Sequence, residues 1–177
     1  MSTSFSNPVN TNDRLIVGVG ELIVTNLQDI TVSTYALGAC VALVGYEPKL
    51  KVGGIIHLML PTRRLDSSGQ TSSPARFVDS GIPMFFQAMR KMGAMPRNLN
   101  LALFGGANPQ KNQNDHFKIG QRNTELSMRM LQKFQLEVSY TDLGGFENRT
   151  IHLTLKTGGV VVRRPSGNLN YDMNKFP

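Results

Sequence analysis

The chain has 177 residues, of which 40% are hydrophobic and 18% charged, a composition typical of one soluble domain with its own hydrophobic core. Its one cysteine excludes an internal disulfide and a cysteine-based metal cluster, and no apolar run reaches the roughly 18 residues of a membrane-spanning helix. The net charge of +7, concentrated after residue 60, favours an acidic partner, but no zinc-ligand pairs, RNP-type aromatic stretch or Arg-crowded helix indicate nucleic-acid binding.

The first part of the chain predicts extended segments that follow a loose tail. Residues 1–13 are polar and lack the basic start and apolar run of a secretory signal, so we expect a flexible tail and a cytoplasmic protein. The apolar stretch 15–25 is interrupted by glycines and predicts a strand or hairpin. Two more extended apolar segments, 35–48 and 52–61, are joined by a short polar turn, and a Ser- and Gly-rich loop follows at 62–74.

An amphipathic helix is predicted for residues 75–94, where apolar side chains recur at helical spacing and a glycine follows. Pro83 leaves the start of this helix open, because a proline inside a helix removes one backbone hydrogen bond. The apolar stretch 99–107 then predicts a strand that runs into a glycine turn.

A second helix is indicated by apolar residues that recur every four positions, namely Leu126, Met130 and Phe134. The alternating residues 136–140 predict a half-buried strand, and the stretch that follows predicts a hairpin turning at 157–159.

Seven or so strands and two helices that do not alternate regularly predict a mixed α/β layered sandwich rather than a doubly wound parallel sheet. We expect this single domain to cover residues 14–165. Residues 166–177 show no regular pattern and predict an irregular C-terminal tail.

Cys40 and His57 are the residues of these segments that could carry chemistry. A thiol is nucleophilic as a thiolate, and an imidazole can take the thiol proton and return it to a leaving group. His57 lies in the extended segment after Cys40, and adjacent segments usually pair side by side. The small residues Gly38 and Ala39 leave room for a substrate, and their backbone amides could stabilise an oxyanion.

A structural role explains the same residues and, on composition and spacing alone, is favoured over catalysis. Free cysteines are usually buried and behave as small hydrophobic side chains. His116 lies in a polar loop, where we expect it to be solvated, and His152 lies in a strand, where we expect it to face outward. Scattered histidines without paired carboxylates make a poor metal site, and no glycine motif has the spacing of a phosphate loop, so we expect no metal and no cofactor.

Seven stretches together resemble one known family, the CheD chemoreceptor glutamine deamidases. They occur in that family's order over residues 15–164 and are LGACVALV, GGIIHLMLP, FVDSGIPMFFQAMRKMGA, FGGA, IGQRN, DLGGFENRTIHL and TGGVVV. No single stretch is decisive, but seven in order are specific.

The resemblance implies a fold similar to the catalytic domain of the cytotoxic necrotizing factor toxins. It implies hydrolysis of glutamine side-chain amides on the cytoplasmic domains of methyl-accepting chemoreceptors, with release of ammonia. The catalytic cysteine would be Cys40, the catalytic histidine His57, and the third member of the site Thr34. It also implies CheC, a phosphatase of the response regulator, as a candidate partner, with no nucleic acid and no membrane insertion.

The chain departs from the family's pattern at three places. Ala39 stands where a serine usually precedes the cysteine, and residues 108–110 read NPQ where many members carry Met-Phe. Asn148 stands where a glycine is usual, and asparagine tolerates a positive φ better than most residues.

Three functions remain open on the sequence. The first is the glutamine deamidase, and the second is a non-catalytic module that binds CheC or a receptor on the same fold. The third is a cysteine peptidase or transglutaminase, because the same nucleophile and base serve those acyl transfers.

Overall fold

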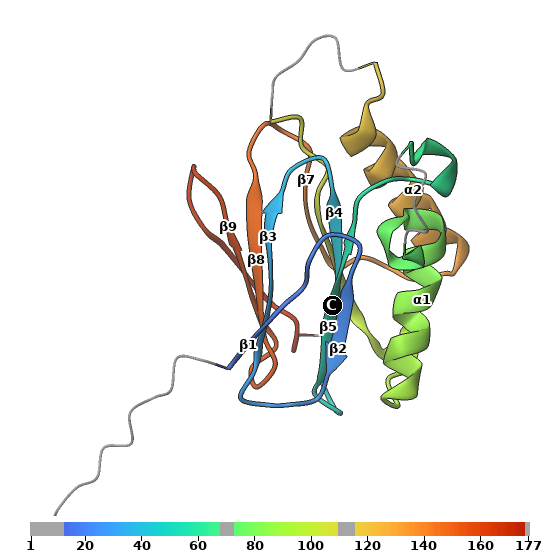
Figure 1. Ribbon diagram of the computed structural model, residues 1–177. Coiled ribbons are helices and arrows are strands. Elements are labelled where there is room, and N and C mark those ends of the chain that lie inside the picture. The colour runs from blue at the N-terminus through green and yellow to red at the C-terminus, as the bar shows by residue number, and fades with distance from the viewer. Residues whose placement is uncertain (1–12, 68–72, 110–115, 176–177) are drawn as a thin grey trace, which may run out of the picture.

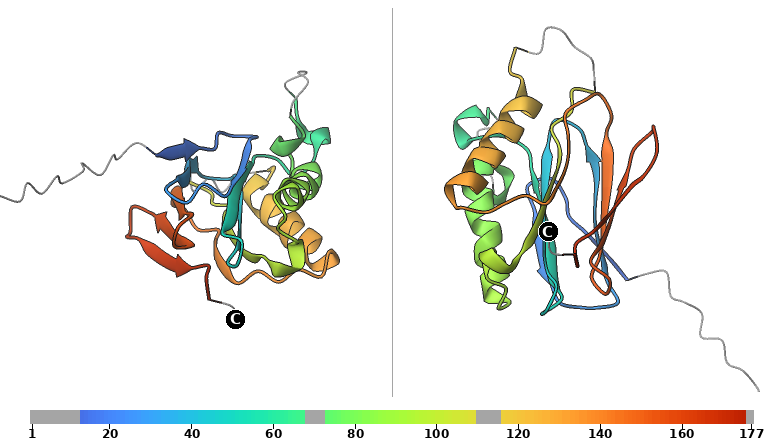
Figure 2. Two further views of the ribbon diagram at one scale, coloured as in Figure 1. Left: turned by 90° about the horizontal axis from the view of Figure 1, so that it is seen from below. Right: turned by 180° about the vertical axis from the view of Figure 1, so that it is seen from behind.

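The computed structural model describes residues 13–67, 73–109 and 116–175. Two five-stranded sheets lie face to face, and two helices cover the outer face of one of them, which gives three layers (Figure 1). Sheet A has the strand order β1-β3-β8-β9-β10, and sheet B has the order β2-β5-β4-β6-β7. Views from below and from behind show the helices on the side of sheet B that faces away from sheet A (Figure 2).

The elements have the following bounds, in chain order: β1 (Arg14–Ile16), β2 (Leu22–Thr25), β3 (Thr31–Leu37), β4 (Val41–Glu47), β5 (Val52–Leu58), α1 (Val78–Lys91), β6 (Asn100–Gly105), α2 (Ile119–Lys133), β7 (Tyr140–Leu143), β8 (Arg149–Thr154), β9 (Gly159–Arg163) and β10 (Leu169–Asp172). No helix in these three ranges is long and apolar enough to cross a membrane.

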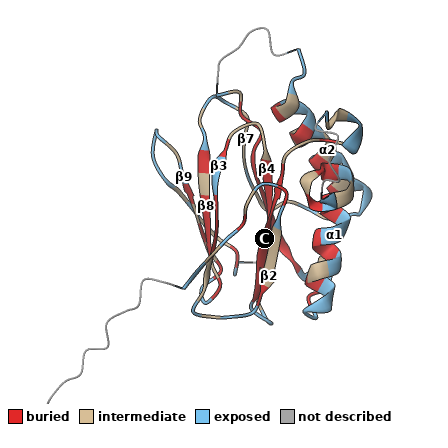
Figure 3. Ribbon diagram, viewed as in Figure 1, coloured by how far each residue is buried: buried red, intermediate tan, exposed pale blue. Residues whose placement is uncertain are grey.

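Sheet B is covered on both faces, so its central strand β4 is buried at every position (Figure 3). Alternate side chains of a strand point to opposite faces. Val41 and Leu43 therefore pack with α1, whereas Ala42 and Val44 pack with the strands of sheet A. The face toward sheet A is the one that bears on the candidate site.

The mixed layered sandwich with two main helices is confirmed. The helix expected over 75–94 is α1, which starts at Val78 because residues Pro74–Arg76 form a short 3-10 turn. Pro83 lies inside α1 and is tolerated there. The hairpin around 157–159 is also confirmed, with β8 and β9 paired antiparallel.

Two predictions for the first fifty residues were wrong. Stretch 15–25 is not one hairpin, since β1 pairs with β3 in sheet A and β2 pairs with β5 in sheet B. Gly20, at φ 75°, lies in the turn that carries the chain from one sheet to the other. Segment 35–48 is also two strands of different sheets, β3 and β4, separated by a short loop at 38–40.

The C-terminal expectations also need correction. The described part contains ten strands rather than about seven, and the tail expected to be irregular contains β10. Leu169 and Tyr171 of β10 pack against the core between the sheets, which is why this polar-looking segment becomes ordered strand. Residues 136–138 precede β7 rather than forming a strand. The N-terminal tail expected for 1–13 lies, apart from Asp13, outside the described residues.

Candidate active site

Cys40 lies in the three-residue loop 38–40 between β3 and β4, and its side chain is partly exposed. The loop begins after an irregularity in β3, where the register with β8 shifts between Thr34 and Leu37. Ala36 has φ 55°, a conformation that a residue other than glycine rarely adopts. Backbone strain of this kind often accompanies functional sites, because the surrounding structure has to hold it.

All three carbonyl groups of the loop are held by neighbouring segments. The Gly38 carbonyl accepts a hydrogen bond from the Ala107 amide at 2.9 Å, and the Cys40 carbonyl accepts one from the Gly106 amide at 2.8 Å. The Ala39 carbonyl accepts one from Asn123 Nδ2 at 2.9 Å. These bonds fix the orientation of the loop's peptide planes.

The amide groups of the loop differ in their availability. The Gly38 N–H donates to the Ala36 carbonyl at 3.0 Å, so it is occupied and does not suit the oxyanion role expected for it. The N–H groups of Ala39 and Cys40 have no backbone acceptor among the residues that the structure describes. Of the three amides of the loop, these two are therefore the ones left for a backbone oxyanion site.

His57 lies on β5, opposite Ala42 of β4, and only 1% of its surface is exposed. Cys40 is two residues before Ala42, so both side chains project from the same face of sheet B, toward sheet A. Diagonal neighbours of this kind have Cα atoms about 7–8 Å apart, within reach of long side chains.

Thr34, from β3 of the opposite sheet, sets the tautomer of the imidazole. Thr34 Oγ1 lies 2.8 Å from His57 Nδ1 and 2.8 Å from the Val17 carbonyl oxygen. A carbonyl can only accept, so the single hydroxyl proton goes to Val17 and Thr34 accepts from Nδ1–H. The neutral imidazole then carries its lone pair on Nε2, the nitrogen that a general base requires.

His57 Nε2 has no hydrogen-bond partner among the described residues, so Cys40 and His57 are not bonded to each other in this structure. Catalytic hydrogen bonds are often long in the absence of substrate and tighten in the complex. The sequence predicts that the two side chains lie within hydrogen-bonding reach. In the structure they project from the same face of sheet B, and His57 Nε2 forms no hydrogen bond with Cys40.

Burial keeps both groups neutral at pH 7. It raises the pKa of the Cys40 thiol to about 11, an effect that the backbone amide of Cys40 and the charge of Arg76 partly oppose. Burial also lowers the pKa of His57 to about 4. The resting site is therefore a thiol beside a neutral imidazole rather than a thiolate–imidazolium pair.

Neither of the other two histidines forms a hydrogen bond with Cys40, His57 or Thr34. His116 is exposed, as expected for a polar loop. His152 projects from sheet A but is only 7% exposed, because Nδ1 bonds Ser33 Oγ at 2.8 Å and the Tyr35 ring packs edge-on against the imidazole. In the described part of the chain, no group of three or more His, Cys, Asp or Glu could hold a metal ion.

Two loops surround the Cys40 loop and contain two of the family departures. A Cβ built on Gly38 would lie 2.9 Å from Asn148 Oδ1 and 3.1 Å from Pro109 Cγ. Asn148 does not have the positive φ that we considered for it; Gly144 and Gly145 take that conformation instead, at 73° and 71°.

Asn123 and Arg76 are site residues that the sequence reasoning did not single out. Asn123 is fully buried on α2 and also donates to the Met59 carbonyl at 2.9 Å. The only signal for it was the stretch IGQRN, which ends at this residue. Arg76 follows a loop that had no periodic pattern, and its carbonyl accepts hydrogen bonds from the amides of Met59 and Leu60.

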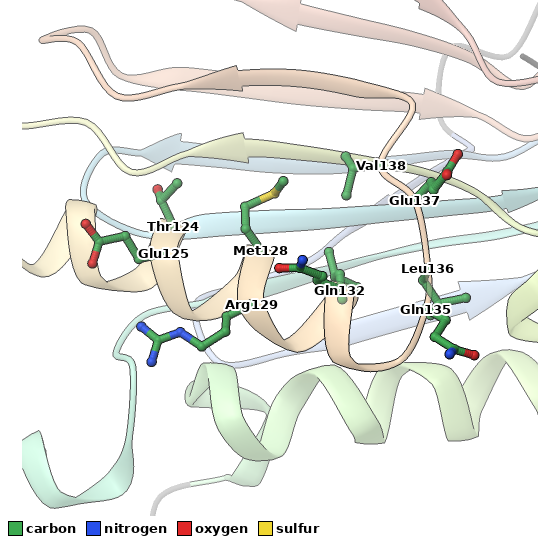
Figure 4. Close-up of a pocket in the computed structure, with 10 residues that line it drawn as sticks. Thr124, Glu125, Met128, Arg129, Gln132, Gln135, Leu136, Glu137 and Val138 are labelled. Carbon is green, nitrogen blue, oxygen red and sulfur yellow. The ribbon is translucent and has the colours of Figure 1, made fainter.

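A separate groove of about 1000 Å³ runs along α2 and the segment that leads to β7 (Figure 4). Its wall combines Met128, Leu136 and Val138 with Glu125 and Arg129. No thiol or imidazole lines this groove, so it does not overlap the candidate site.

Comparisons with known proteins agree on one family. A model of the family described as CheD chemotactic sensory transduction matches residues 59–164. A protein of Syntrophus aciditrophicus named probable chemoreceptor glutamine deamidase CheD 1 is 37% identical over 155 residues, 88% of this chain and 96% of that protein. The protein of Thermococcus kodakarensis named probable chemoreceptor glutamine deamidase CheD is 38% identical over 151 residues, 85% of this chain and 92% of that protein.

A solved structure, the hypothetical protein YfiH of Bacillus licheniformis, matches 68% of this chain and 49% of its own with a TM-score of 0.46 and 11% identity, a likeness too distant to bear on function.

The family match begins just after His57. The relatives' alignments are too long to leave out the segment 34–57. Identity at this level over nearly the full length of both chains, together with the family match, shows that the chain belongs to the CheD family.

Proposed function

We propose that this protein is a protein-glutamine deamidase that acts on the cytoplasmic domains of methyl-accepting chemoreceptors. The relatives' names supply the reaction and the substrate. The observation that supports it in this chain is the bond between Thr34 and His57, which leaves a lone pair on Nε2, on the face that carries Cys40. A cytoplasmic location is part of the proposal, because the proposed substrate is cytoplasmic.

The first half of the reaction forms a thioester. The Cys40 sulfur attacks the carboxamide carbon of the target glutamine while its proton passes to His57 Nε2. The carbonyl oxygen becomes an oxyanion, which the N–H groups of Ala39 and Cys40 stabilise. The intermediate then breaks its C–N bond as Nε2–H protonates the nitrogen, and ammonia leaves.

The second half restores the enzyme. A water molecule gives a proton to Nε2 as its oxygen attacks the thioester carbon. The C–S bond breaks, the sulfur recovers the proton from Nε2, and glutamate leaves the site. Thr34 holds the imidazole in one tautomer through both halves, the part that the third member of a catalytic triad plays.

Burial of both groups fits a proton transfer that is concerted with attack. With a thiol pKa of about 11 and an imidazole pKa of about 4, a standing ion pair is unfavourable before substrate binds. Negative charge on the sulfur therefore has to pass to the oxyanion as it forms, which makes the reaction depend on the oxyanion amides.

The decisive experiment incubates the protein with a cytoplasmic receptor fragment from the same organism and maps Gln-to-Glu conversion by mass spectrometry, with ammonia release as a second readout. Cys40→Ala should abolish the conversion, because the chain has no other thiol. Cleavage of the fragment would indicate a peptidase instead, and incorporation of an added primary amine would indicate a transglutaminase.

A non-catalytic binding module is the second candidate, and the observation that favours it is the unengaged Nε2 of His57. Receptor binding that survives Cys40→Ala, together with a wild type that releases no ammonia, would support the module. A CheC partner belongs to the proposal as well, and co-purification of the two proteins would test it.

A further inference from the structure

The buried side chain of Asn123 connects the loop that carries the proposed nucleophile with the end of the strand that carries the proposed base. Its Nδ2 donates to the Ala39 carbonyl, in the loop of Cys40, and to the Met59 carbonyl, two residues after His57, both at 2.9 Å. No part of Asn123 is exposed, although it belongs to a helix of otherwise mostly polar residues.

The chemistry of its neighbours fixes the orientation of this amide. Both partners are carbonyl oxygens, which can only accept, so the nitrogen of Asn123 must face them and the oxygen must face away. Oδ1 has no hydrogen-bond partner among the described residues. Burying an unpaired amide oxygen costs free energy, and an apolar side chain would avoid this cost. The advantage of asparagine at this position therefore lies in the two hydrogen bonds that its Nδ2 donates.

The bond to the Ala39 carbonyl has a consequence for Cys40. No peptide bond in the described part of the chain is cis, and in a trans peptide the C=O and N–H groups point in opposite directions. With the Ala39 carbonyl directed at Asn123, the N–H of Cys40 points away from α2. This N–H has no backbone acceptor among the described residues, and it lies close enough to the sulfur to lower the thiol pKa.

We propose that Asn123 is a positioning residue that holds the Ala39–Cys40 peptide so that the Cys40 N–H is presented to the oxyanion formed on the substrate. The inference rests on the proposed cysteine-based acyl transfer. Asn123 touches neither substrate nor sulfur and acts through the peptide plane. The second bond, to Met59, keeps the loop in register with the strand end that carries His57.

Two reagents separate this role from a merely structural one. Acylation of Cys40 by p-nitrophenyl acetate forms an S–C bond through a tetrahedral oxyanion and expels p-nitrophenolate, with the thiol proton passing to His57 Nε2. Alkylation by iodoacetamide is a direct displacement of iodide and forms no oxyanion. Cys40→Ala supplies the background rate for both reagents, because Cys40 is the only thiol.

Asn123→Ala and Asn123→Leu should both slow acylation about ten- to hundredfold, less than the roughly hundred- to thousandfold effect of deleting an oxyanion donor, because the Cys40 N–H remains but loses its fixed orientation. Alkylation should slow much less, since it forms no oxyanion and depends on this N–H only through the thiol pKa. Leu is similar to Asn in size, has no donor group, and serves if the alanine variant does not fold. Ser127→Ala is the matched control, since Ser127 is buried one turn later on α2 and its hydroxyl has no partner among the described residues. It should leave both rates unchanged.

A wild-type ratio of acylation to alkylation in both Asn123 variants would overturn the proposal. It would also fall if wild-type Cys40 were alkylated but not acylated. Failure of the deamidase proposal looks different: Cys40 would acylate normally, and the Asn123 effect would hold, while receptor glutamines stayed unconverted.

Discussion

Thr34 and His57 join the two sheets of the sandwich through one hydrogen bond, with Oγ1 2.8 Å from Nδ1. Thr34 belongs to β3 of sheet A, and His57 belongs to β5 of sheet B. The orientation of the imidazole therefore depends on the spacing of the sheets as well as on its own strand. Since the hydroxyl proton is committed to the Val17 carbonyl, one tautomer of His57 is selected.

Thr34→Val keeps the shape of the side chain and removes this selection. We expect kcat to fall roughly ten- to hundredfold, because the proton on Nδ1 loses its acceptor and the base loses its fixed orientation. The free energy of unfolding should fall by about 1–3 kcal/mol, the usual cost of leaving a buried polar group unpaired. Receptor-fragment deamidation and urea unfolding measure the two effects.

Thr34→Ser is the control for this substitution, because it retains the hydroxyl. It should keep most of the activity. If serine and valine at this position were equally impaired, the methyl group rather than the hydroxyl would matter, and the tautomer argument would fail.

The sequence was enough to predict that the side chains of Cys40 and His57 lie on the same face of a sheet, because this depends on two neighbouring segments of the chain. A short turn joins the two segments, so they pair as neighbours, and the observed register puts His57 opposite Ala42. The role of Thr34 came only from the family resemblance. It lies in the other sheet, and no periodicity within one segment reports how two sheets pack.

The wrong predictions for segment 15–25 and for the C-terminal strand also arise from contacts between parts of the chain that are far apart in sequence. Segment 15–25 has the pattern of one hairpin, yet β1 and β2 pair with different sheets, because each finds its partner far along the chain. β10 becomes a strand because Leu169 and Tyr171 complete the core between the sheets. Asn123 escaped notice because a lone asparagine on a helix has no distinguishing pattern until the two carbonyls that it binds are known.

The buried state of His57 predicts that stability falls in mild acid. Its pKa is lowered from 6.5 to about 4 in the folded protein, so between these values the unfolded chain binds a proton that the folded chain does not. Stability should therefore be fully present above pH 6.5 and decline as the pH falls to about 4, by at most about 3 kcal/mol. Urea unfolding at a series of pH values measures this loss.

In a variant that lacks this imidazole, the free energy of unfolding should change less with pH between 6.5 and about 4. His57→Gln removes the buried titrating group. Burial also lowers the pKa of His152, so a residual slope in His57→Gln is expected. An unaltered slope in that variant would mean that His57 is protonated without cost in the fold.

Arg76 should tune the reactivity of the thiol. Its charge lowers the pKa of Cys40 against the larger effect of burial. Arg76→Gln should raise that pKa further and slow alkylation by iodoacetamide about two- to tenfold at pH 8–9, where the rate follows the thiolate fraction. Arg76→Lys should retain most of the wild-type rate. Lys156→Gln removes an exposed charge from the turn between β8 and β9, at the end of sheet A opposite the loop, and should have no effect; equal slowing in both Gln variants would indicate a general charge effect.

The Cys40 loop packs tightly against Asn148 and Pro109 at Gly38. A substitution at Gly38 should therefore be partly compensated by a second substitution at Asn148. Gly38 does not have a positive φ, so alanine there is opposed only by space: its Cβ would lie 2.9 Å from Asn148 Oδ1 and 3.1 Å from Pro109 Cγ. Gly38→Ala should therefore displace the loop and reduce kcat, with little change in the free energy of unfolding, since the loop is partly exposed.

Asn148→Gly removes the nearer obstacle and introduces the residue usual in the family. It should be close to wild type alone and should restore part of the activity of Gly38→Ala, with a coupling free energy of roughly 0.5–2 kcal/mol in a double-mutant cycle. The rescue should be incomplete because Pro109 still crowds the added methyl group. Strictly additive effects would show that Asn148 does not support the loop, and the loss in Gly38→Ala would then have to arise from Pro109 alone.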